Sequence, residues 1–255
     1  MEKARFRSAD IYGQRIHMPP RQAIAGHAIG IVVLDLWYPY FPGNVANATT
    51  YDFPVRYKVL RGATGEMIFR ADPALLDMVL EAGREFEEDG VRALVGACGY
   101  FGNYQQQAAA ALDIPVFLSS LLQVPMVHRG LKPTQKVGIL VASAENATPR
   151  MLENCGVTPD IPIAIKGMDG QPEFQNILDC TGHQEYGKLE QELVAKAQEL
   201  VAENPEVGAI VLECSDMPPF AWAIQRAVQL PVFDFNTLIN WVYRGLLPQR
   251  YDGYF

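Results

Sequence analysis

The amino-acid sequence predicts an α/β protein with parallel sheets, because short apolar runs alternate with helical segments along most of its length. An internal repeat is the second observation. At one ungapped offset of 116 residues, Cys98 aligns with Cys214, and the segment IPVF at 114–117 aligns with LPVF at 230–233. We therefore expect two halves of one βαβ design, with a cysteine at the same point in each half.

The first half is expected to begin with a buried strand and a long excursion. Its predicted elements are a strand over 26–35, an extended piece near 55–61 in an otherwise irregular stretch, a helix over 72–90, a strand over 91–98 and a helix over 103–112. The first run is short and rich in β-branched residues, which is typical of a strand buried on both faces. Asp72 can cap the helix that follows it, and Pro73 suits the first turn.

The second half repeats this order. Its predicted elements are a strand over 136–143, a helix over 186–206, a strand over 207–214 and a helix over 218–229. Apolar residues of the long helix, such as Leu189, Leu193 and Leu200, are spaced to lie on one buried face. Each cysteine of the repeat therefore ends a strand and precedes a helix.

Composition restricts the class of function. The net charge is -8, which argues against a nucleic acid as the main partner, because binding to phosphates needs positive charge. No run of about 18 apolar residues predicts a membrane span. The first residues lack the apolar stretch of a signal peptide, so we expect a cytoplasmic protein. Residues 1–24 are locally basic, and we expect them to form a solvated arm or a strap on a partner subunit.

Four cysteines are present, at positions 98, 155, 180 and 214. No close pair has the spacing of a zinc ribbon, and without a secretory signal a disulfide framework is not expected. Cys180 and His183 form a lone pair of potential metal ligands, which is more typical of a coincidence in a loop. We therefore expect reduced thiols and no metal site.

The positions of Cys98 and Cys214 indicate acid–base chemistry. Parallel sheets present ligands to the loops at the carboxyl ends of their strands, where both residues fall. If an approximate two-fold axis relates the halves, the two thiols face one cleft from opposite sides. One thiol could then remove a proton and the other return one, and a helix N-terminus favours the thiolate, so no cofactor is needed. The alternative is that each cysteine is a small buried hydrophobe.

At this level of detail the chain resembles the aspartate/glutamate/hydantoin racemase superfamily, over about residues 27–245. The resemblance rests on GIVVLD, VGACGYFG, VGILVAS and LECSDMPP, in that order. It implies two pseudo-symmetric Rossmann-like (flavodoxin-like) domains with parallel sheets, an active site in the inter-domain cleft, and no cofactor. It also implies that the chain crosses over, with a first domain of 25–112 plus 230–255 and a second domain of 113–229.

The resemblance also implies roles for individual residues. Cys98 and Cys214 fall where the family keeps its two acid–base thiols. Asp35 falls where many of its amino-acid racemases keep a carboxylate that orients the first thiol, with a loop cap as the alternative. Those enzymes usually follow the second cysteine with Thr-His, whereas this chain has Ser215 and Asp216. Asp216 could replace the histidine with a carboxylate or cap the next helix, and the difference argues against aspartate or glutamate as the substrate.

Further candidates for substrate binding lie in the long excursion and at strand ends. They are Asn47, Thr49, Thr50, Gly99, Tyr100, Ser119, Ser143 and Ser215, with turn chemistry as an equal alternative for the polar side chains. Trp37, Tyr38 and Tyr40 could hold a cationic sulfonium or ammonium group against their ring faces. They could instead pack under a loop.

These observations lead to three hypotheses for function. The first is a cofactor-independent racemase or epimerase of a small carboxylate, which transfers a proton between Cys98 and Cys214. The second is a lyase or isomerase that uses the same cysteines, similar to the dimethylsulfoniopropionate lyases or maleate isomerases of the superfamily. The third is a binding protein that keeps the cleft without turnover. In each case we expect a homo-oligomer, a dimer or larger, with no nucleic-acid or membrane partner.

Overall fold

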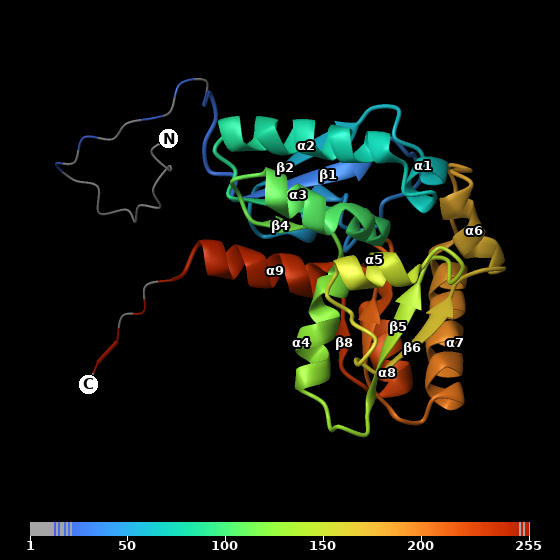
Figure 1. Cartoon of the computed structure of the whole chain (residues 1–255). Helices are drawn as coiled ribbons and strands as arrows, with labels where there is room; N and C mark the ends of the chain where they lie inside the picture. The colour runs from blue at the N-terminus through green and yellow to red at the C-terminus, as the bar shows by residue number, and fades with distance from the viewer. Residues whose placement is uncertain are drawn as a thin grey trace.

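The computed structural model describes residues 22–249 and seven flanking residues, namely 13, 15, 18, 20, 251, 253 and 254. The basic arm expected over 1–24 therefore lies largely outside the described residues. Within them, the chain forms two lobes, each built on its own sheet (Figure 1).

Both sheets are parallel and have four strands. The first sheet has the order β2-β1-β3-β4 and contains β1 (Ile29–Leu34), β2 (Val55–Leu60), β3 (Ala93–Gly96) and β4 (Val116–Phe117). The second has the order β6-β5-β7-β8 and contains β5 (Lys136–Val141), β6 (Ile163–Gly167), β7 (Val207–Leu212) and β8 (Val232–Phe233). The strand order is the same in both sheets, so the repeat seen in the sequence is a repeat of architecture. The predicted α/β class with two Rossmann-like halves is confirmed.

The helices cover these sheets and connect their strands. The α-helices are α1 (Gly65–Phe69), α2 (Pro73–Glu88), α3 (Gln105–Ala111), α4 (Val124–Arg129), α5 (Pro149–Asn154), α6 (Pro172–Leu178), α7 (Tyr186–Glu203), α8 (Ala221–Val228) and α9 (Phe235–Leu246). Short 3-10 helices are η1 (Ala48–Thr50), η2 (Gly99–Tyr104), η3 (Ser120–Gln123) and η4 (Pro218–Phe220). As predicted, Asp72 caps α2, since its side chain accepts a hydrogen bond from the Ala74 N–H.

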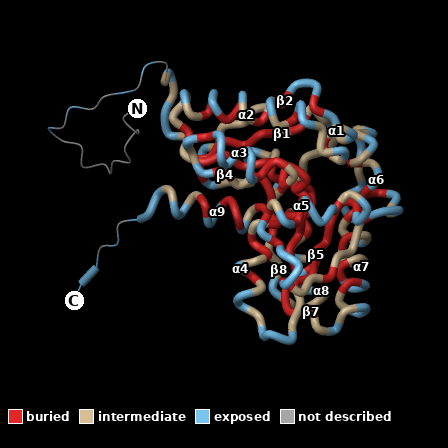
Figure 2. Tube along the Cα trace, in the orientation of Figure 1, coloured by how far each residue is buried: buried red, intermediate tan, exposed pale blue. Residues whose placement is uncertain are grey.

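The first sheet is buried on both faces because successive residues of its central strand point in opposite directions. Ile29 and Ile31 belong to a core that includes α9, whereas Val32 and Leu34 belong to the core that includes α2. Gly30 allows the ring of Phe86 to approach the strand closely, because a Cβ there would lie 2.6 Å from that ring. Buried residues follow the strands of both lobes and the region where the lobes meet (Figure 2).

The chain crosses between the lobes twice. It leaves the first lobe after β4, and it returns after β8, so that α9 packs beneath the first sheet (Figure 1). Gln123 joins the two crossings, because its Nε2 donates to the Asp234 carbonyl and its Oε1 accepts from the Thr237 hydroxyl, each at 2.8 Å. Sheet membership therefore changes a few residues later than the expected divisions at 113 and 230, because β4 pairs with β3 and β8 pairs with β7.

Candidate active site

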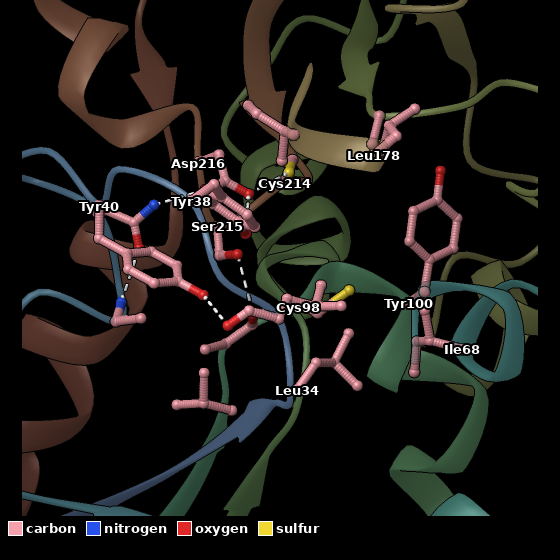
Figure 3. A pocket seen from close by; sticks show the side chains of 18 of the residues that line it. Leu34, Tyr38, Tyr40, Ile68, Cys98, Tyr100, Leu178, Cys214, Ser215 and Asp216 are labelled. Atoms are coloured by element: carbon pink, nitrogen blue, oxygen red, sulfur yellow. Dashed lines mark hydrogen bonds between the residues drawn. The ribbon is translucent and has the colours of Figure 1, made fainter. Parts of the chain in front are cut away.

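A cavity lies at the carboxyl ends of the strands, where the two sheets face each other. Leu34 and Cys98 reach it from the first lobe, and Ala142 and Cys214 reach it from the second. Figure 3 shows the two sulfur atoms on side chains that come from separate strand ends and point into this one space. The central geometric expectation from the sequence, that both thiols share a pocket, agrees with this arrangement.

Cys98 follows β3 and occupies the N-cap position of η2. Burial is the main reason that its pKa lies well above the ordinary value, and the Glu213 carboxyl raises the pKa further. The backbone N–H groups of Tyr100 and Phe101 act in the opposite direction, because they favour the thiolate. The Phe101 N–H donates to the Cys98 carbonyl at 3.1 Å, so the first turn of η2 starts directly at this residue.

Cys214 follows β7 and is 7% exposed. Its pKa is also raised, first by burial and then by the negative charges of Asp216 and Glu213. The thiol donates a hydrogen bond to Oδ2 of Asp216 over 3.4 Å. The two sulfurs are thus unlike: backbone N–H groups favour the thiolate of Cys98, whereas the thiol of Cys214 donates a hydrogen bond to a carboxylate.

Asp216 is the centre of a small polar cluster. Its Oδ1 accepts a hydrogen bond from Asn44 Nδ2 at 2.6 Å, and its Oδ2 accepts one from the Tyr38 hydroxyl at 3.2 Å. Burial raises the pKa of Asp216, while the hydrogen bonds from Cys214, Asn44 and Tyr38 oppose that rise. Asn44 belongs to the long excursion after β1, which thereby contributes to the lining of the cavity.

Two of the three aromatic candidates line the cavity. The rings of Tyr38 and Tyr40 lie 4.5 Å apart between centroids and are tilted by 43°. Burial raises the pKa of Tyr40 to about 12 and is also the main cause of the raised pKa of Tyr38, so both hydroxyls stay neutral near pH 7. Trp37 does not join them: its side chain is 67% exposed and lies against Gly182.

Comparison with known proteins shows the family to which the chain belongs. The model of the family described as Asp/Glu/Hydantoin racemase matches residues 64–241. The chain belongs to this family. The resemblance drawn from the sequence is thereby confirmed.

Curated relatives of this racemase-family chain are lyases by name. Dimethylsulfoniopropionate lyase 3 of Emiliania huxleyi (strain CCMP1516) is 28% identical over 235 residues, which cover 88% of this chain and 61% of the relative. Dimethylsulfoniopropionate lyase of Durusdinium sp. clade D is 28% identical over 232 residues, which cover 86% of this chain and 75% of the relative. The chain thus spans about three fifths of the length of the algal relative named first.

Solved structures of other proteins share the fold. Unliganded arylmalonate decarboxylase superposes with a TM-score of 0.57 at 14% identity, covering 88% of this chain and 94% of that one. A glutamate racemase from Bacillus anthracis superposes with a TM-score of 0.56 at 12% identity, covering 87% and 84%. At these identities the likeness concerns the fold alone.

Hydrogen bonds beside the cavity connect the two lobes, and they involve Tyr100, Ser143 and Ser215. The Tyr100 hydroxyl donates to the Ser143 carbonyl at 2.7 Å and accepts from the Ser143 N–H at 2.8 Å. The Ser215 hydroxyl donates to the Ala97 carbonyl at 2.9 Å. Tyr100 and Ser215 line the cavity, whereas Ser143 takes part only through its backbone contact with Tyr100.

The structure does not bring Asp35 into the cavity, which corrects the role expected for it. Its carboxylate accepts from the Gly62 N–H and forms an ion pair with Arg61, both at 2.9 Å. The backbone bond from Gly62 is the main cause of a lowered pKa, and Arg61 adds to it. Asp35 lies one residue beyond the end of β1, so its side chain points to the next turn rather than into the cavity.

Five further candidates support the walls without lining them. Asn47 caps η1 and binds Thr49, and Thr50 donates to the Asn44 carbonyl. Ser119 caps η3, and Gly99 packs against Glu213. For the four polar side chains, the alternative of turn chemistry is the one observed.

Glu213 and the apolar wall are features that the sequence analysis missed. Glu213 is fully buried between β7 and Cys214, and burial raises its pKa to about 8. Its signal in the sequence was an acidic residue within an otherwise apolar strand end, LEC. Ile68 and Phe69 of α1 and Leu178 of α6 form the apolar wall, and these short helices had no clear pattern.

The side chains that line the cavity carry acidic but no basic groups among the described residues. Among the described residues that line it, Asp216 is acidic and none is lysine, arginine or histidine. A search of the same described residues finds no group of three histidine, cysteine or acidic side chains that could hold a metal ion. Their helices also include none that is long and apolar enough to cross a membrane.

Proposed function

We propose that the protein is a lyase of the racemase family that needs no cofactor. It removes the proton beside the carboxylate of a small substrate, and a cationic group leaves from the next carbon. The observation that carries this proposal is a cavity with two thiols, a buried acid and two tyrosine rings, in which none of the described lining residues is basic. The printed names of the curated relatives support the same class of reaction.

The charge of the cavity favours a substrate that brings its own cation. Burial and acidic neighbours raise the pKa of both thiols, so thiolate formation in the cavity as described is unfavourable. A positive charge close to the sulfurs would reverse this effect, because an opposite charge favours the ionised form. A sulfonium or ammonium group can lie against the rings of Tyr38 and Tyr40 and near Asp216, which attract cations.

The two thiols take different roles in the proposed reaction. Cys98 is the base, because two backbone N–H groups already favour its thiolate. Its sulfur takes the proton from the carbon next to the carboxylate, and the electrons of that C–H bond form a double bond to the next carbon. The bond from that carbon to the leaving group breaks, and its electron pair departs with a neutral sulfide or amine. Cys214 keeps its proton on the hydrogen bond to Asp216 and closes the opposite side of the cavity.

Inversion of a stereocentre is the second candidate, and it uses the same residues. The observation that favours it is that the proton of the Cys214 thiol is held next to the cavity, ready for delivery to the face opposite Cys98. The sequence ranked this reaction first. The curated relatives place it second, since their printed names are those of lyases.

A paired assay tests the proposal. The full chain is incubated with dimethylsulfoniopropionate while headspace sulfide and the alkene acid are measured, and in parallel with chiral amino and hydroxy acids in deuterated water. We expect sulfide and alkene acid to appear together. Cys98→Ser should lower kcat by about 10³-fold, the scale of a lost general base. Cys180→Ser is the matched control, because Cys180 does not line the cavity, and it should keep activity.

Other outcomes would replace or end the proposal. Deuterium at the α-carbon of a chiral acid, without sulfide, would favour the racemase. If neither product nor exchange appears, or if Cys98→Ser and Cys214→Ser keep full turnover, the proposed thiol chemistry is wrong. Ligand binding that survives both substitutions without any turnover would identify a binding protein.

A further inference from the structure

Glu213 is a buried acid beside both thiols that the proposed reaction does not use. Its side chain is fully buried, and it directly precedes Cys214 in the chain. In space it packs on the residue after Cys98, because a Cβ added to Gly99 would collide with the Glu213 carboxyl group and its carbonyl oxygen. The carboxyl group therefore stands between the two strand ends that carry the thiols.

The surroundings of Glu213 hold its carboxyl group in a neutral form. Oε2 accepts a hydrogen bond from the Ala142 N–H at 3.1 Å, whereas Oε1 is buried and has no hydrogen-bond partner among the described residues. A buried carboxylate with one unpartnered oxygen is costly, and protonation removes that cost. Because Oε2 already accepts a hydrogen bond, the proton belongs on Oε1. The raised pKa of about 8 agrees with this assignment.

Glu213 is also a position at which the two halves of the internal repeat differ. In the alignment that pairs Cys98 with Cys214, the residue opposite Glu213 is Ala97. The backbone of Glu213 is fixed on both sides, since its N–H donates to the Leu140 carbonyl and its carbonyl accepts from the Ser120 hydroxyl. These hydrogen bonds keep the backbone of Glu213 beside both thiols, so a charge on its carboxyl group raises the pKa of Cys98 and of Cys214.

We propose that Glu213 is a positioning residue that must stay neutral for Cys98 to form its thiolate, and whose ionisation suppresses that thiolate. This inference rests on the proposed thiol chemistry. The Glu213 carboxyl group packs against Gly99, the residue after Cys98, and after burial its charge is the largest cause of the raised pKa of Cys98. When Glu213 is neutral, only burial and the more remote Asp216 oppose the effect of the Tyr100 and Phe101 N–H groups on the sulfur, whereas an ionised Glu213 adds a further charge that disfavours the thiolate.

Every other titratable group near Glu213 is acidic or neutral. Cys98 and Tyr100 face it from the segment after β3, Cys155 lies at the end of α5, and Cys214 and Asp216 follow it in the chain. None of these groups, taken from the described residues, can neutralise a negative Glu213. Its ionisation would therefore add to the charge of Asp216 instead of being compensated.

The test measures the thiolate itself rather than turnover. Wild-type protein and Glu213→Gln are treated with iodoacetamide at several pH values from about 7 to about 10, and the rate of Cys98 alkylation is followed by peptide mass spectrometry. Above about pH 8, where Glu213 ionises in the wild-type protein, we expect Cys98 to be alkylated about tenfold faster in Glu213→Gln, the effect of one buried charge at short range. Glu206→Gln is the matched control: it removes the same charge at the opposite end of β7, about 20 Å away, and should not move the profile.

A second variant guards against misfolding. Glu213→Met keeps the length of the side chain without a charge, and it should shift the profile in the same direction as Glu213→Gln. Unchanged profiles in both Glu213 variants, or equal shifts in Glu213→Gln and Glu206→Gln, would overturn the inference. A failure of the proposed function would instead be seen as full turnover by Cys98→Ser, and it leaves the alkylation result readable on its own.

Discussion

Replacing Tyr100 with phenylalanine should loosen the junction between the lobes. The substitution removes one oxygen atom, but that atom serves both the carbonyl and the N–H of Ser143, at 2.7 and 2.8 Å. Tyr100 is 1% exposed, so both backbone groups would lose a partner in a buried environment. An unsatisfied buried group costs about 1–3 kcal/mol, which gives a loss of about 3 kcal/mol for the pair. For a chain of this size that corresponds to a fall in Tm of about 6–12 °C.

Urea denaturation and a thermal melt of the Tyr100→Phe variant would measure this loss. Tyr104→Phe is the control, because the Tyr104 hydroxyl donates only to the Asp72 carbonyl, within the first lobe. It should cost about 1 kcal/mol. If the two variants unfold within about 0.5 kcal/mol of each other, the junction at Tyr100 has no special importance and the reasoning from its double contact fails.

Three further predictions concern the site. Gly99→Ala should destabilise the protein by about 1–3 kcal/mol in urea and abolish turnover, because its Cβ has no room against Glu213; wild-type stability would contradict this contact. Folding raises the pKa of Glu213 from 4.5 to about 8, so the free energy of unfolding of the wild-type protein should fall by up to about 5 kcal/mol as the pH rises through that window. Urea denaturation at several pH values should show a flatter dependence on pH for Glu213→Gln. Asp216→Asn should lower kcat about 10–100-fold, because Cys214 loses its charged hydrogen-bond acceptor; an unchanged kcat would exclude that role.

Much of the fold could be predicted, because its long elements have clear patterns. The strand over 26–35 became β1, the helix over 72–90 became α2 and the helix over 186–206 became α7, each with ends trimmed by a few residues. The sequence shows no clear helix or strand pattern from 149 to 178. The elements of this stretch, α5, β6 and α6, have five to seven residues each, which is too short for periodicity to stand out.

The candidate site was predicted where it depends on strand ends and missed where it depends on long-range folding. Cys98 and Cys214 line one cavity because parallel strands bring their carboxyl ends together. Asn44 donates a hydrogen bond to Asp216, which is 172 residues away in the sequence, and no local sequence pattern predicts such a contact. The family resemblance predicts Asp35 beside the first thiol. Asp35 lies one residue past the end of β1, however, and its side chain points to the neighbouring loop at Gly62.

The bridge at Gln123 limits how the cavity can be entered. Two connections link the lobes, and Gln123 joins them through Asp234 and Thr237. Opening of the cavity would also have to break the contacts of Tyr100 with Ser143 and of Ser215 with Ala97. The two sulfurs would then face one molecule only after these contacts form again.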